Sequence, residues 1–93
     1  MEKENLTSVL QELSLLFECY KHLEEWSKEQ GKHDAAVAGQ QRVYTRMYNI
    51  LNDDAIWAII GTNEPYPLED YAIFVLQDTP QYINRLKNHI NSL

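Results

Sequence analysis

The clearest pattern in the chain is an apolar stripe of helical period near the N-terminus. Apolar side chains recur there at steps of three and one residues, which places them on one arc of a helix with about 3.6 residues per turn. The stripe consists of Leu6, Val9, Leu10, Leu13, Leu16, Phe17, Tyr20 and Leu23. Gly31 follows as a residue suited to the end of a helix. The pattern predicts a first helix over about residues 5–30.

Four further side chains form a second line on the same segment, roughly opposite the stripe. Leu15, Cys19, His22 and Trp26 follow one another at i, i+4, i+7 and i+11, and we call them the outer ridge. A hairpin of two helices leaves such a ridge in water. Two explanations stay open: a later helix of the same chain covers the ridge, or the ridge contacts a partner protein or a second copy of the chain.

A broader apolar arc predicts a second helix over about residues 34–52. The arc contains Ala36, Val37, Val43, Tyr44, Met47, Tyr48, Ile50 and Leu51. Asp34 is suited to cap this helix, because its carboxylate can accept hydrogen bonds from the free amides of the first turn. The small residues at 35–39 permit a close approach of another helix. With a short glycine-centred turn between them, the two helices are expected to form an antiparallel hairpin.

The rest of the chain predicts shorter helices. Residues 53–61 are typical of a short buried helix that is capped by Asn52 or Asp53 and ends at Gly61. Thr79 and Pro80 are suited to the N-cap and first position of a C-terminal helix.

The apolar runs at 55–60 and 71–77 leave one ambiguity, because they flank a turn-rich loop. They can pair as a two-stranded hairpin, which would give an α+β fold instead. We favour helices, since an isolated two-stranded ribbon is only marginally stable. The expected fold is all-α: a single domain over residues 1–93, a bundle of four to five helices built on the N-terminal antiparallel hairpin.

Composition narrows the class of protein. The 93 residues carry eight Lys and Arg against 14 Asp and Glu, a net charge of −6. Such a chain repels phosphate backbones, which disfavours nucleic-acid binding. No apolar run is long enough to span a membrane, and the N-terminal segment lacks the small-residue cleavage site of a signal peptide. The single cysteine forms no internal disulfide, so we expect a cytoplasmic protein.

Two pairs of residues suggest chemistry, and both have plainer explanations. His33 and Asp34 form the dipeptide with which HD-type phosphohydrolases hold metal ions, but a capping role explains Asp34 without a metal. Cys19 and His22 adjoin on a helix, yet nothing around them supplies an oxyanion hole. Phosphate-binding loops, paired cysteines and hydrolase signatures are absent from the sequence. We therefore expect a non-enzymatic protein with no cofactor and no metal.

Several side chains are candidates for binding. Arg42 and Arg46 stack one turn apart on the polar side of the second helix. Either they are solvated or salt-bridged, or they contact an anion or an acidic partner. Tyr44 and Tyr48 are candidates for the lining of a ligand pocket. Tyr66 is held between two prolines and is a candidate for the partner surface together with the outer ridge.

One spacing in the second helix resembles a DNA-binding motif. Ala35 and Gly39 have the Ala-x-x-x-Gly spacing of a helix-turn-helix, with residues 42–51 as the recognition helix. Arg42 and Arg46 are the only basic residues on that segment, which argues against DNA binding.

Three hypotheses about function remain, in order of preference. The first is a protein–protein interaction module: a small acidic inhibitor, adaptor or regulator that occupies a partner's surface, with a homodimer or higher homo-oligomer as one form. The second is a helical protein that binds a small ligand or nucleotide. The third is a helix-turn-helix-like DNA binder.

Overall fold

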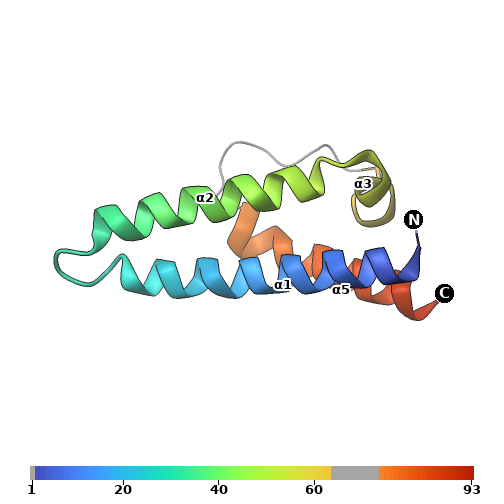
Figure 1. The fold of residues 1–93 in the computed structure, drawn as a ribbon, viewed down its shortest axis with the longest axis horizontal. Coiled ribbons are helices and arrows are strands. Elements are labelled where there is room, and N and C mark those ends of the chain that lie inside the picture. Colours follow the sequence, from blue (N-terminus) through green and yellow to red (C-terminus); the bar gives the residue numbers. More distant parts are fainter. Residues whose placement is uncertain (1, 64–73) are drawn as a thin grey trace.

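The N-terminal half of the chain is a long antiparallel helical hairpin. The computed structural model describes residues 2–63 and 74–93, and in it α1 (Lys3–Trp26) lies side by side with α2 (His33–Leu51) (Figure 1). The apolar stripe of α1 faces inward: Leu6, Leu13 and Tyr20 are fully buried. The hairpin predicted from the sequence is confirmed.

Close packing between the two helices depends on Gly39. A Cβ atom at this position would lie 3.1 Å from Cδ1 of Leu23 on α1, closer than ordinary van der Waals contact. The glycine costs α2 about 1 kcal/mol relative to alanine, and in return Leu23 packs directly against the α2 backbone. Beside it, Ala36 is fully buried and Gln40 is nearly so.

The turn of the hairpin differs in detail from the prediction. α1 ends at Trp26, a few residues before the expected boundary, and Gly31 lies inside the turn with a φ of 78°, where a residue without Cβ is favoured. Asp34 is not the N-cap: α2 begins at His33, Lys32 occupies the cap position, and no side chain caps the helix. Because the helix starts earlier, Asp34 lies within its first turn, where a carboxylate still interacts favourably with the helix dipole.

α3 (Asp54–Ile60) follows directly and has the cap that the sequence predicts. The Asp53 carboxylate accepts hydrogen bonds from the amides of Ala55 (2.9 Å) and Ile56 (3.2 Å). The helix ends at Gly61, as expected. Its last carbonyl, that of Ile60, accepts a hydrogen bond of 2.8 Å from Nη1 of Arg85, which ties α3 to the C-terminal helix.

The C-terminal segment begins with a π-helix, η1 (Phe74–Asp78), that runs directly into α5 (Thr79–Asn91). Thr79 was predicted as an N-cap, and this is wrong: Asp78 holds the cap position, and no side chain caps α5. The backbone passes from η1 directly into α5 without a capping turn. Thr79 therefore lies within the helix, and its side chain is fully buried in the core. Pro80 was predicted at the first position of the helix and occupies the second, still within the first turn.

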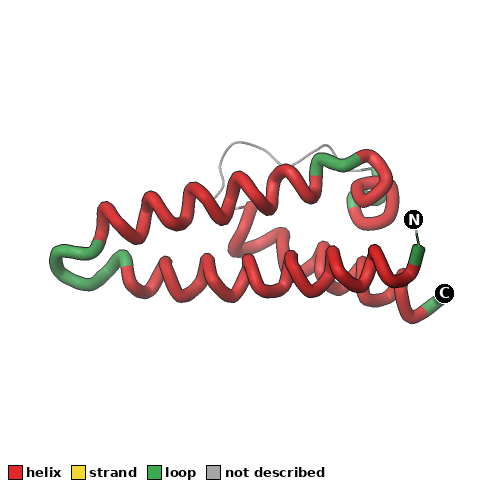
Figure 2. Tube along the Cα trace, viewed as in Figure 1, coloured by secondary structure: helices red, strands yellow, loops and turns green. Residues whose placement is uncertain are grey.

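α5 completes the bundle by packing on α1 and α3 (Figure 2). The Trp57 ring of α3 meets the edge of the Tyr82 ring of α5 at a centroid distance of 5.3 Å. Figure 1 shows that α5 runs beside the part of α1 near the N-terminus, so the turn end of the hairpin extends beyond it.

The fold is all-α, as the sequence predicts. The alternative two-stranded hairpin is wrong, because residues 55–60 belong to α3 and residues 74–77 to η1. Residues 71–73 of the second predicted strand lie outside the described residues. None of the helices in the described part of the chain has the length and apolarity needed to cross a bilayer.

The caps provide a test of this architecture. We expect Asp53→Ala to lower the free energy of unfolding by about 1 kcal/mol, because two amides of α3 lose their acceptor. Asp34→Ala is the matched control and should cost less than about 0.5 kcal/mol, since only the dipole interaction is lost. Urea denaturation followed by circular dichroism measures both. A larger loss for Asp34→Ala would contradict the observed start of α2.

Candidate functional site

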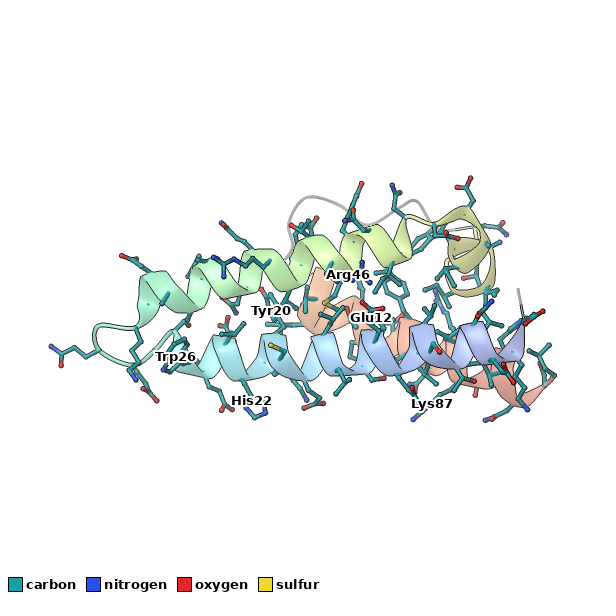
Figure 3. The ribbon with its side chains drawn as sticks, in the orientation of Figure 1. Glu12, Tyr20, His22, Trp26, Arg46 and Lys87 are labelled. Atoms are coloured by element: carbon teal, nitrogen blue, oxygen red, sulfur yellow. The ribbon has the colours of Figure 1, made fainter. Side chains whose placement is uncertain are left out.

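The outer ridge lies exposed on α1. The Leu15 side chain is 71% exposed and Trp26 is 36% exposed, and Cys19 and His22 are also exposed. In Figure 3, His22 points away from α2. No helix within residues 2–63 and 74–93 therefore covers the ridge, which contradicts the explanation that a later helix of the same chain packs on it.

Leu13 and Leu15 show that α1 has one face in the core and the opposite face in solvent. The two leucines are two residues apart, about 200° around the helix, and Leu13 is fully buried while Leu15 is 71% exposed. A single exposed leucine is ordinary on a protein surface. Here Leu15 lies in line with the aromatic ring of Trp26 on the same helix, so the ridge presents apolar side chains at both of its ends.

Residues of the hairpin turn contact the end of the ridge at which Trp26 lies. Nζ of Lys32 lies 5.2 Å from the centroid of the Trp26 ring, a cation–π distance. The same ammonium group is 3.9 Å from a carboxylate oxygen of Glu29. The carbonyl oxygen of Ser27 is 3.2 Å from Nδ1 of His33. Lys32 thus joins the Trp26 indole to the turn, and the side chain keeps 36% of its surface exposed.

One side of the ridge carries acidic side chains. Glu18 pairs with Lys21 at 2.9 Å, and both side chains are largely exposed. Glu25 is exposed, and no described residue forms an ion pair with it. The ridge is therefore bordered by negative charge along α1.

The two candidate arginines have different environments. Nε of Arg46 donates a 2.5 Å hydrogen bond to Glu12 of α1, so its charge is engaged within the hairpin (Figure 3). Arg42 is exposed and lies in an open depression on α2, which is also lined by Ala38, Gln41 and Thr45. The two arginines thus lie one turn apart on α2, as predicted, but only Arg46 forms an ion pair with α1.

The predicted ligand-lining tyrosines are not brought to that depression. Tyr44 and Tyr48 are half-buried and pack on each other with ring centroids 5.9 Å apart at an angle of 47°. Neither belongs to the described lining around Arg42. Tyr66 lies outside the described residues.

Other predicted motifs can be placed as well. α2 is continuous through Gly39, so the turn of a helix-turn-helix predicted there is wrong. Within the described residues no group of three or more His, Cys, Asp or Glu side chains is arranged to hold a metal ion.

Two polar residues on α1 were missed by sequence reasoning. Glu12 pairs with Arg46, and Glu24 accepts a 2.8 Å hydrogen bond from Nε2 of the buried Gln40. The sequence holds no signal for either contact, because both depend on the register of α1 against α2, which the pattern within one helix does not contain.

Comparison with known proteins gives no relative from which the role of this surface could be inferred. No protein-family model matches the chain, and no curated protein or solved structure matches it. The function of the chain is therefore inferred from its own exposed residues. Of the sequence-predicted sites that the structure describes, the outer ridge is the one that combines exposed apolar groups in a single continuous line.

A pair of substitutions tests the two faces of α1. We expect Leu13→Ala to lower the free energy of unfolding by about 3 kcal/mol, because it leaves a cavity in the core. Leu15→Ala should change it by less than about 0.5 kcal/mol, since the side chain is mostly in water. Chemical denaturation of both variants gives the comparison. Similar losses at both positions would show that the outer ridge is part of the core.

Proposed function

We propose that the chain is a non-enzymatic protein-interaction module, a small acidic inhibitor, adaptor or regulator that binds the surface of another protein through the outer ridge. The observation that carries this proposal is the exposure of Leu15 and Trp26 on one line of α1. Trp is strongly enriched among the residues that dominate binding energy at protein interfaces. Burying Leu15 against a partner would contribute about 1.5–3 kcal/mol.

The size of the ridge supports a reversible interaction. From Leu15 to Trp26 it spans about 17 Å at 1.5 Å per residue, which is shorter than the contact of a permanent complex. A net charge of −6 favours association with a basic partner surface and raises the rate of encounter. These properties suit a regulator that binds and releases its target.

The cytoplasm is the compartment that we propose for this activity. Cys19 is exposed on the outer ridge, and within the described residues there is no second cysteine with which it could pair. A reducing compartment keeps such a thiol free and keeps the surface of the ridge unmodified.

The proposal is tested by capture from a lysate of the source cells. The bait proteins are the wild type, the ridge variant Leu15→Ser/Trp26→Ser and the control Leu93→Ser, whose leucine is 59% exposed at the C-terminus. We expect the wild type and the control to retain the same proteins and the ridge variant to lose them. Identical capture by all three baits would contradict the proposal.

Self-association is tested on the same variants by light scattering during size-exclusion chromatography. A mass above that of the monomer in the wild type, lost in the ridge variant, would identify a second copy as the occupant of the ridge. A monomer at tens of micromolar leaves another protein as the partner.

A further inference from the structure

The spacing of the outer ridge is that of a coiled-coil seam. Its residues follow one another at steps of four, three and four. In a heptad written abcdefg, Leu15 and His22 take position d, and Cys19 and Trp26 take position a. In coiled coils these positions contact the partner helix, while the flanking e and g positions set which partner is accepted.

The two flanks of this seam differ. Leu16 and Leu23 fall at e, on the side of α2, where both are half-buried against the core. Glu18 and Glu25 fall at g, on the open side, and both are exposed. Of the positions that flank the seam at e and g, only g carries charged side chains, and both of them are negative.

The charges at g are available to a partner. Glu25 forms no ion pair with a described residue. Glu18 pairs with Lys21, but an exposed pair of this kind contributes only about 0–1 kcal/mol. Glu18 can therefore exchange Lys21 for a cation of the partner at little cost.

A second copy of the chain offers no cations at e or g of its seam to pair with Glu18 and Glu25. Antiparallel seams bring the g positions of the two helices together, so Glu18 and Glu25 would face the same residues of the other chain. Parallel seams bring g beside e, where Leu16 and Leu23 offer no cation. Like charges placed side by side are destabilising, which disfavours self-association through this face.

We propose that the occupant of the outer ridge is a basic amphipathic helix of another protein. Its apolar stripe covers Leu15 and Trp26, and Lys or Arg residues beside that stripe pair with Glu18 and Glu25. This inference rests on the proposed function and names the chemistry of the partner.

Two synthetic peptides serve as probes. Both are 21-residue helices with Leu at a and d; one carries Lys at e and g and the other carries Glu. Like charges at e and g keep each peptide from pairing with itself. We expect isothermal titration of the wild-type protein to show at least tenfold tighter binding of the Lys peptide. Leu15→Ser should weaken that binding at least fivefold, and Leu93→Ser should leave it unchanged.

Charge-reversal variants test whether the charges beside the seam or the net charge of the protein determine which peptide binds more tightly. Glu18→Lys/Glu25→Lys should invert the preference, so that the Glu peptide binds more tightly. The control Glu2→Lys/Glu4→Lys makes the same change in net charge at exposed positions near the N-terminus of α1, eleven or more residues before Leu15, and should keep the wild-type preference. Circular dichroism checks that all variants remain helical.

Three outcomes would overturn the inference: no discrimination between the peptides, equal effects of the two charge-reversal pairs, or a wild-type dimer that Leu15→Ser dissolves. Lysate capture distinguishes this failure from that of the proposed function. If the peptides fail while Leu15→Ser/Trp26→Ser still loses captured proteins, the ridge binds a partner of other chemistry. If both fail, the proposed function fails with it.

Discussion

The packing of α1 against α2 is the constraint on which the rest of the structure depends. Leu23 of α1 occupies the space beside Gly39 that a side chain would need, and Tyr20 is buried close by along the same face. These contacts fix the rotation of α1 about its own axis. With that rotation fixed, the face that carries Leu15 and Trp26 must turn outward, so the outer ridge is a direct consequence of how the hairpin core is packed.

Polar contacts set the register of the same pair of helices. The pair between Glu12 and Arg46 joins the hairpin where α5 packs beside it, and the hydrogen bond from Gln40 to Glu24 joins it near the turn. An exposed ion pair contributes little to stability. The buried amide of Gln40 has more influence, because a shift in register would leave its donor without an acceptor in the core.

Periodicity alone was sufficient to predict the hairpin, the all-α class and the position of the outer ridge on α1. The helix ends were harder: Asp34 and Thr79 both have the chemistry of caps, but where a helix starts depends on the path of the turn before it. Whether the outer ridge is exposed or covered was not predictable either, because it depends on the side of α1 on which α5 packs. The partner of Arg46 required the hairpin register, which a pattern within one helix does not contain.

The two tryptophans occupy contrasting environments. Trp57 lies against Tyr82 in the core, whereas Trp26 lies at the end of the outer ridge beneath the ammonium group of Lys32. Their emission should therefore respond to different events, that of Trp57 to loss of the bundle and that of Trp26 to a change of solvent at the surface of the hairpin. The chain thus carries two intrinsic optical reporters, one of folding and one of docking, without any added label.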